Sequence, residues 1–201
     1  MVRVAIFDYG SGNLFSLKAA FDRISAEVQI IHDLENLDEF NCLVLPGVGN
    51  FDPAIKCIKN HKKQLNNAIE NDMPTLGICL GMEILFNRSD EGILKGLNIL
   101  DGDVISLPKK KKIPHMGWNN LKVVRDSKLL KGLDHNTWVY FVHSYRVKPK
   151  NRKIIVAKSD YGLEFPAIIE SKKLFGTQFH PEKSGDVGMI MLRNFLRECE
   201  K

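Results

Sequence analysis

Residues 74–81 read Pro-Thr-Leu-Gly-Ile-Cys-Leu-Gly, a stretch that places one cysteine between two glycines. The apolar residues from Pro74 to Ile78 predict a short buried strand, and those from Leu80 onward predict a short helix. Cys79 thus stands at a sharp strand-to-helix turn with a glycine two residues away on either side, which is the G-x-S-x-G nucleophile pattern with cysteine in place of serine. We expect Cys79 to be a nucleophile whose thiolate is favoured by the helix N-terminus, although a core cysteine ahead of a helix fits the same pattern.

The segments before this turn alternate between strand and helix. Strands are predicted at 2–7, 28–31 and 42–45, and helical sequence at 14–25 and 51–71, the latter interrupted. This alternation predicts an α/β fold with a mostly parallel sheet and helices on both faces. After residue 90 strand-like segments follow one another as antiparallel edge elements, and an amphipathic helix closes the chain at 188–200. These strand-like segments are 97–107, 120–124, 137–147, 154–157, 167–170 and 174–179.

The composition is that of an ordinary folded protein. The chain has 201 residues, a net charge of +5 and 44% hydrophobic residues, which excludes a disordered or low-complexity chain. With no repeat or linker, residues 1–201 are expected to form a single domain. No apolar stretch approaches the roughly 18 residues of a membrane span, and no signal peptide is evident. The four cysteines show no C-x-x-C spacing, so we expect no metal site, reduced thiols and a cytoplasmic location. Cys42 and Cys57 are interpreted as packing residues.

The basic residues raise the question of nucleic-acid binding. They are spread along the chain, apart from one run at Lys109–Lys112. A basic binding module would use such a run as a contact, whereas the alternative is a solvated surface with a local basic patch.

A candidate base lies near the C-terminus, in the sequence Thr-Gln-Phe-His-Pro-Glu at 177–182. A cysteine nucleophile needs a base, and the base needs an orienting group. His180 follows a predicted strand, Pro181 stiffens the turn, and Glu182 is close enough in sequence to orient the imidazole. A His-Pro-Glu turn alone is unremarkable, but with the cysteine turn it indicates a Cys-His-Glu set.

The motifs Gly-Ile-Cys-Leu-Gly (77–81) and Gln-Phe-His-Pro-Glu (178–182) resemble the signature of the class I glutamine amidotransferases, and the resemblance covers essentially the whole chain. It implies their three-layer α/β fold, a glutaminase activity, no cofactor and no metal. By this resemblance Cys79 attacks the side-chain amide of L-glutamine, His180 is the general base and acid, and Glu182 orients His180. Ammonia leaves, and hydrolysis of a cysteinyl thioester releases glutamate.

Further motifs at 8–13, 46–49, 114–119 and 141–145 are similar to the glutaminase subunits of imidazole glycerol phosphate synthases. In those enzymes a separate (β/α)8 cyclase subunit receives the ammonia through a channel and makes imidazole glycerol phosphate and AICAR in histidine biosynthesis. The resemblance therefore implies a heterodimer with a cyclase on another chain, and neither nucleic acid nor membrane as partner.

The resemblance also assigns residues around the pocket. Glycines let a peptide plane turn toward a substrate, so the loop at 46–49 can supply oxyanion donors beside the N–H of Leu80. The oxyanion hole is expected at Val48, Gly49 and Leu80, with substrate contacts from Gly47, Gly49, Glu83, Ser144 and Tyr145. Residues at the mouth that faces the cyclase are expected to be Asn13, Met116, Trp118, Tyr140 and Lys183, with Trp118 in a loop.

Glu83 departs from the family pattern, which has glutamine at this position. A carboxylate there accepts hydrogen bonds from the ammonium group of glutamine but repels its carboxylate. We therefore expect an altered affinity for glutamine.

Two alternatives remain open at this stage. A paralogous glutaminase that supplies ammonia for amidination of a surface sugar would keep every motif above. A non-catalytic basic binding or scaffold protein would use the lysine run instead, but the intact cysteine, histidine and glutamate argue against it.

Overall fold

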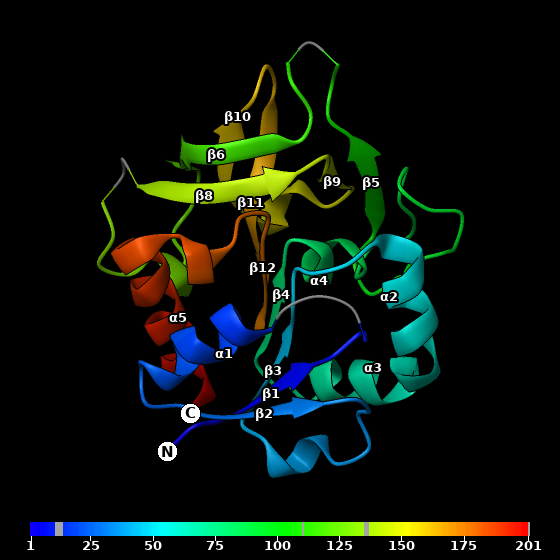
Figure 1. Ribbon diagram of the computed structural model, residues 1–201, viewed down its shortest axis with the longest axis vertical. Helices are drawn as coiled ribbons and strands as arrows, with labels where there is room; N and C mark the ends of the chain where they lie inside the picture. Colours follow the sequence, from blue (N-terminus) through cyan, green and yellow to red (C-terminus); the bar gives the residue numbers. More distant parts are fainter. Residues whose placement is uncertain (11–13, 110, 135–136, 201) are drawn as a thin grey trace.

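The computed structural model describes residues 1–10, 14–109, 111–134 and 137–200. An eight-stranded sheet forms its centre, in the order β2-β1-β3-β4-β12-β11-β10-β7. Two further pairs of strands, β5 with β9 and β6 with β8, lie beside it (Figure 1). The strands are β1 Arg3–Phe7, β2 Glu27–Ile31, β3 Cys42–Leu45, β4 Thr75–Ile78, β5 Gly102–Ser106, β6 His115–Asn120, β7 Lys122–Val123, β8 Trp138–His143, β9 Tyr145–Pro149, β10 Ile155–Asp160, β11 Glu164–Ser171 and β12 Leu174–Thr177.

The sheet has a parallel half and an antiparallel half. Strands β2, β1, β3, β4 and β12 pair in parallel, whereas β12, β11, β10 and β7 pair antiparallel. The carboxyl ends of the parallel strands therefore meet at one edge, which is where α/β proteins place their sites. The expected mostly parallel sheet with antiparallel edge strands is confirmed.

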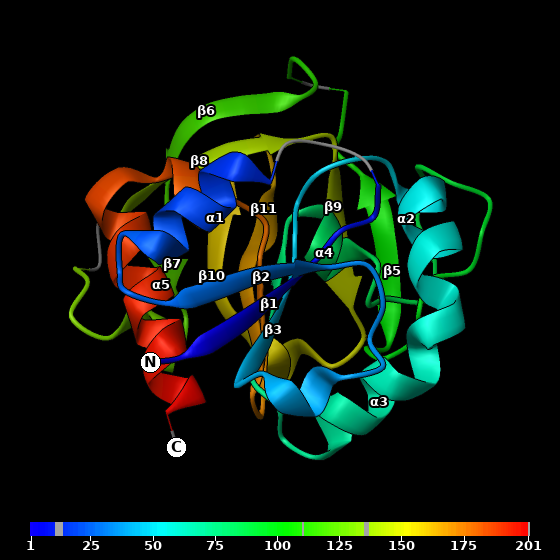
Figure 2. The same cartoon turned by 60° about the horizontal axis from the view of Figure 1, so that its bottom comes forward.

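Helices cover both faces of the sheet, as the sequence predicted. The α-helices among the described residues are α1 Phe15–Asp22, α2 Phe51–Ile58, α3 Lys62–Glu70, α4 Leu80–Glu83 and α5 Gly185–Cys199. The two views in Figures 1 and 2 show α1 and α5 on one face and α2 and α3 on the other. Short 3-10 turns lie at Leu37–Glu39, Lys59–His61, Lys128–Leu130, Arg152–Ile154 and Pro181–Lys183. None of the helices in the described part of the chain is long and apolar enough to cross a membrane.

Alternation along β1 explains why this strand is apolar throughout. Val4 and Ile6 pack into the core that also holds Phe21 of α1 and residues of α5. Ala5 and Phe7 pack on the opposite face, in the core that includes residues of α2 and α3. A strand buried on both faces reads as a continuous hydrophobic run rather than as an alternating one.

The second half of the chain differs from the sequence prediction in three places. The segment with Trp118, expected as a loop, is strand β6, which pairs with β8. The single strand expected at 137–147 is two strands, β8 and β9, which are separated at Ser144. The strand expected at 97–107 is confined to β5. Strands β5, β6, β8 and β9 form separate pairs rather than edges of the main sheet because their partners are one another.

Candidate functional site

Cys79 lies at the turn between β4 and α4 with a strained backbone. Its φ is 47° and its ψ −107°, a conformation that residues with a side chain rarely adopt. Both flanking glycines are sterically required. A Cβ atom on Gly81 would come within 1.9 Å of the Leu45 carbonyl oxygen, and one on Gly77 within 2.7 Å of the Gly81 carbonyl oxygen. The predicted sharp strand-to-helix turn is thus confirmed, together with the need for a glycine on either side of Cys79.

His180 is brought to this turn by the pairing of β12 with β4. The N–H of Cys79 donates to the Thr177 carbonyl at the end of β12, at 2.6 Å, and His180 follows three residues later. Strand β8 fixes the next turn, because His180 N–H donates to the Tyr140 carbonyl at 3.0 Å and the Ser184 hydroxyl accepts from the Tyr140 N–H at 3.0 Å.

Glu182 holds the ring of His180. The distance between His180 Nδ1 and Glu182 Oε1 is 2.7 Å, and both side chains are almost fully buried. A carboxylate accepts this bond, so it fixes the proton on Nδ1 and leaves the lone pair on Nε2. A Cβ atom on Gly47 would lie 2.9 Å from His180 Cε1 and 3.0 Å from Cys79 Cβ. The imidazole and the thiol therefore flank the same glycine, which brings the three predicted residues together.

A cavity of about 200 Å³ opens beside the sulfur. It lies at the carboxyl ends of β3 and β4 and is lined by all the expected substrate-contact residues. These are Gly47, Gly49, Glu83, Ser144 and Tyr145, together with Cys79, Leu80, Glu91, Pro114, Val142 and His143. The side chain of Val48 is partly buried against the core on the side of α1 and α5, and the expected role of this residue in the oxyanion hole stays a prediction. Gly49 has a φ of 101°, so the loop at this point requires a glycine.

The surroundings of Cys79 favour the protonated thiol. Burial raises its pKa well above the usual value, and the negative charge of Glu83 raises it further. Hydrogen bonds from the Leu80 N–H and the Gln178 amide lower the pKa but are outweighed. The expected stabilisation of the thiolate by the helix N-terminus is therefore not dominant, because burial raises the pKa of the thiol more than the hydrogen bonds lower it. A protonated thiol needs a base before its sulfur can attack a carbon atom, and the imidazole of His180 lies next to the same glycine, Gly47, as Cys79.

Glu83 is buried behind Cys79, and burial raises the pKa of its carboxyl group to about 7. The Gln178 amide donates to Glu83 Oε1 at 2.9 Å and to Cys79 Sγ at 3.7 Å. Sequence reasoning missed both Gln178 and Glu91, which faces the same cavity. The position of Gln178 within the His-Pro-Glu motif was the available signal for it, whereas Glu91 stands in a loop with no motif around it.

Two buried histidines lie next to this site. His115 Nδ1 is 2.9 Å from His143 Nε2, and His143 Nδ1 is 2.7 Å from the Tyr145 carbonyl oxygen. Because a carbonyl only accepts, His143 carries its proton on Nδ1, and Nε2 accepts from His115. Burial lowers the pKa of His115 to about 4 and that of His143 to about 3. Both rings are therefore neutral. Their hydrogen bonds connect His115 of β6 to Tyr145, which lines the cavity.

The β6–β8 pair presents an exposed apolar face. In its register Trp118 lies opposite Tyr140 and Met116 opposite Val142. The indole and phenol rings contact edge to face, with centroids 5.9 Å apart. Met116 is 62% exposed and Trp118 53%, values that suit a partner contact. Trp138, at 50%, extends this face and was missed by sequence reasoning, as its motif-free position offered no signal.

The remaining predicted residues are placed as follows. Lys183 is exposed in the turn after His180. Asn13 lies outside the described residues, as does Lys110 in the lysine run. Lys111 Nζ stands over the Tyr161 ring at 5.0 Å, and the Tyr161 hydroxyl donates to the Lys112 carbonyl at 2.8 Å. Part of the run therefore packs against the β10–β11 turn.

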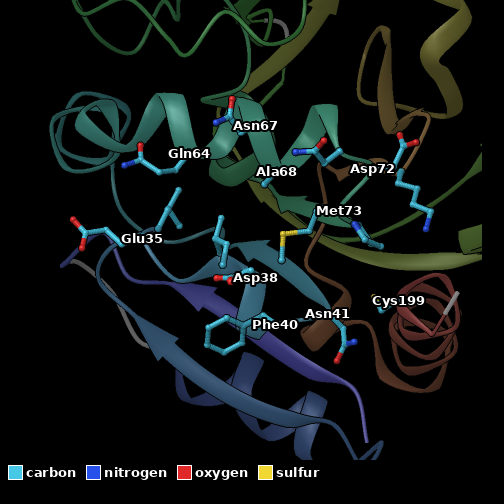
Figure 3. Close-up of a pocket in the computed structure, with 15 residues that line it drawn as sticks. Glu35, Asp38, Phe40, Asn41, Gln64, Asn67, Ala68, Asp72, Met73 and Cys199 are labelled. Carbon is cyan, nitrogen blue, oxygen red and sulfur yellow. The ribbon is translucent and has the colours of Figure 1, made fainter.

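A larger cavity, of about 740 Å³, lies at the opposite edge of the sheet (Figure 3). Asn41 and Pro74, which line it, precede β3 and β4, so it adjoins the amino ends of the parallel strands. Acidic side chains stand around it, including Glu35, Asp38 and Asp72. It contains none of the residues around Cys79. The smaller cavity is the candidate site because Cys79 lines it. The imidazole of His180, which Glu182 holds, lies next to Cys79 at Gly47.

Solved structures share this architecture. A glutamine amidotransferase crystal structure superimposes with a TM-score of 0.76 at 17% identity and covers 98% of this chain and 99% of that chain. PurLQS from Thermotoga maritima gives a TM-score of 0.76 at 19% identity, again with 98% and 99% coverage. At such low identity these matches show the fold alone, and they confirm the expected fold class.

Sequence relatives are much closer. The chain is 46% identical to the imidazole glycerol phosphate synthase subunit HisH of Methanothermobacter thermautotrophicus, over 96% of this chain and 97% of the relative. It is 44% identical to the same subunit of Aquifex aeolicus, over 100% and 99%. Residues 5–199 match the family "Glutamine amidotransferase class-I". The chain therefore belongs to the class-I glutamine amidotransferases and, among them, to the HisH family.

Proposed function

We propose that this chain is the glutaminase subunit of an imidazole glycerol phosphate synthase in histidine biosynthesis, folded as one amidotransferase domain. The observation that carries the proposal is the placement of Cys79, on a strained turn beside the glutamate-bound imidazole of His180, at the mouth of a small polar cavity. The HisH relatives, named as subunits of that synthase, support the assignment to this pathway.

The proposed reaction begins from the hydrogen bond between His180 Nδ1 and Glu182, which leaves Nε2 free to accept a proton. His180 Nε2 takes the Cys79 proton as sulfur attacks the side-chain carbonyl carbon of glutamine. The resulting oxyanion accepts from the N–H of Leu80 and from N–H groups of the glycine loop that includes Gly49. His180 then returns its proton to the leaving nitrogen, and ammonia departs. Water, deprotonated by the same imidazole, hydrolyses the thioester to glutamate and restores the thiol.

The cavity suits the two ends of glutamine. Glu91 brings a carboxyl group toward it, while Ser144 and Tyr145 line it from the connection between β8 and β9. A carboxylate is a natural acceptor for an α-ammonium group. The cavity volume of about 200 Å³ fits a single amino acid rather than a peptide.

The partner in this proposal is a cyclase subunit that binds the exposed face of β6 and β8. Met116, Trp118 and Trp138 supply apolar area on that face, and Lys183 supplies charge nearby. The same strand β8 holds His180 through the Tyr140 carbonyl, and the Val142 carbonyl lies 3.9 Å from Cys79 Sγ. A partner docked on this face would therefore lie close to the point where ammonia is released.

Purification with the cyclase subunit tests the proposal. The complex should release glutamate and ammonia from glutamine, faster when the cyclase ligand is bound. Cys79→Ala should abolish release while the complex still forms. Turnover by that variant at more than about one-thousandth of the wild-type rate would refute the cysteine mechanism. Rescue of a histidine auxotroph by the paired genes tests the pathway. Failure of rescue with intact glutaminase activity would instead favour the sugar-amidination paralogue.

A further inference from the structure

The buried side chains behind Cys79 form a continuous chain of hydrogen bonds. The Gln178 amide nitrogen has two hydrogens, and it donates to Glu83 Oε1 at 2.9 Å and to Cys79 Sγ at 3.7 Å. Gln178 is fully buried and Glu83 is 4% exposed. The nucleophile is thus linked through one amide to a carboxyl group that has no role in the triad.

The arrangement is unfavourable for Gln178 itself. Its amide oxygen is buried without a hydrogen-bond partner in the described part of the chain, and an unsatisfied buried acceptor destabilises the folded state. The position of the amide is therefore determined by its two donor bonds and not by full satisfaction of its polar atoms. Native proteins keep such unsatisfied buried groups mainly at functional sites.

We propose that Glu83 and Gln178 are a positioning pair that controls the nucleophile, with the neutral Glu83 carboxyl group supporting thiolate formation at Cys79 and the ionised group opposing it. The inference rests on the proposed function of Cys79 but concerns a different pair of residues.

The charges in the cavity support opposite effects of neutral and ionised Glu83 on the Cys79 thiol. Four groups face Glu83. They are the Cys79 thiol at the start of α4, the Gln178 amide after β12, the Glu91 carboxyl group in the loop after α4, and the Tyr145 hydroxyl of β9. Glu91 raises the pKa of Glu83 and the Gln178 bond lowers it, while burial dominates and sets it at about 7. Ionised Glu83 in turn raises the pKa of the Cys79 thiol. The activity of the wild type relative to that of Glu83→Gln should therefore fall as the pH rises through about 7.

Alkylation of Cys79 tests the pair without reference to glutamine. Iodoacetamide is applied to the full-length chain between pH 6 and pH 8, and modified Cys79 is quantified by peptide mass spectrometry. Glu83→Gln should react at close to the wild-type rate at pH 6 and about tenfold faster at pH 8, because a neighbouring charge shifts a pKa by about one unit or more. Glu35→Gln, at the distant acidic cavity, is the charge-matched control and should follow the wild type. Equal rates for Glu83→Gln and wild type at pH 8 would overturn the proposal.

Glutamine hydrolysis by the complex tests the role of Gln178. Wild-type kcat/KM should fall relative to that of Glu83→Gln as the pH passes about 7. Gln178→Met keeps the side-chain length but removes the donor, so Glu83 holds its proton longer and the fall should move to higher pH. A merely structural role for Gln178 would lower activity without moving the profile.

The two assays separate this inference from the proposed function. A complex that releases ammonia with the same pH profile and the same alkylation rate as Glu83→Gln refutes the pair but keeps the glutaminase. A pH-dependent difference in alkylation without any ammonia release keeps the pair and refutes the glutaminase.

Discussion

The His115–His143 pair makes the protein sensitive to acid. In the neutral pair each ring nitrogen has one defined role: His143 Nδ1 donates to the Tyr145 carbonyl, and His143 Nε2 accepts from His115 Nδ1. The side-chain amide nitrogen of Asn119 lies 3.3 Å from His115 Nε2 and can donate to it. His115 also stacks between Phe141 and Tyr161, at centroid distances of 4.8 and 4.0 Å. A proton added to either ring would place two N–H groups against each other or leave a charge among aromatic rings.

The size of the effect follows from the pKa values. Folded, the two groups have pKa values of about 4 and about 3, against 6.5 without the protein environment. The unfolded chain therefore takes up protons first as the pH falls. The stability contributed by the neutral pair is complete above pH 6.5 and is lost as the pH falls toward 4. Each histidine contributes up to about 1.4 kcal/mol per pH unit, so the pair lowers the free energy of unfolding by about 2–4 kcal/mol between pH 7 and pH 5.

Urea unfolding at pH 7 and pH 5 measures this loss. His115→Gln removes one of the two titrating groups and should reduce the loss by about half. His32→Gln is the control, because it also removes one histidine but from an exposed position, and its loss should stay near the wild-type value. A wild-type free energy of unfolding that is the same at both pH values would refute the reasoning, as would an unchanged loss in His115→Gln.

Four other substitutions test the site. Cys79→Gly should be about 1 kcal/mol more stable than Cys79→Ala in urea unfolding, because glycine relieves the positive φ; equal stability would mean that the turn is unstrained. Glu83→Gln should lower the KM for glutamine about threefold or more at pH 8, since it removes a negative charge that repels the carboxylate of glutamine. An unchanged KM would mean that Glu83 does not contact the substrate. Glu182→Gln should lower kcat by about 10²–10⁴-fold with the fold intact by circular dichroism, because the imidazole loses its orienting carboxylate, and a loss under tenfold would argue against that role. Trp118→Ala should weaken binding of the cyclase subunit by about tenfold or more in calorimetry, whereas Val124→Ala, an exposed apolar residue off the β6–β8 pair, should leave it unchanged.

The first half of the fold was predictable because its signals are local. The apolar run of β1, the strand before Cys79 and the glycine-flanked turn each depend on neighbouring residues, and the structure confirms them. The His180–Glu182 contact was also predictable, because the two residues lie two positions apart with a proline between them.

The second half depends on long-range pairing, which explains the errors there. Strand β6 carries Gly117 and two asparagines, residues that are depleted in strands, and it is extended because it pairs with β8. The break between β8 and β9 at Ser144 separates the partners of β6 from those of β5. No local signal in the sequence marks that division.

Long-range pairing also explains why some residues of the site were not predicted. His115 meets His143 across 28 residues, and Gln178 meets Glu83 across 95. Each residue alone is an ordinary polar side chain in an apolar segment. Their roles arise only when β6 pairs with β8 and β12 pairs with β4, so a reading of single motifs does not find them.

Covalent trapping is the most direct test of Cys79 as the nucleophile that attacks glutamine. The complex with the cyclase subunit is treated with an electrophilic analogue of glutamine, and the modification of all four cysteines is followed by mass spectrometry together with the release of ammonia. We predict that Cys79 is labelled ahead of Cys42, Cys57 and Cys199, and that activity disappears in proportion to its labelling. Full labelling of Cys79 with activity retained, or loss of activity through one of the other three cysteines, would contradict the account.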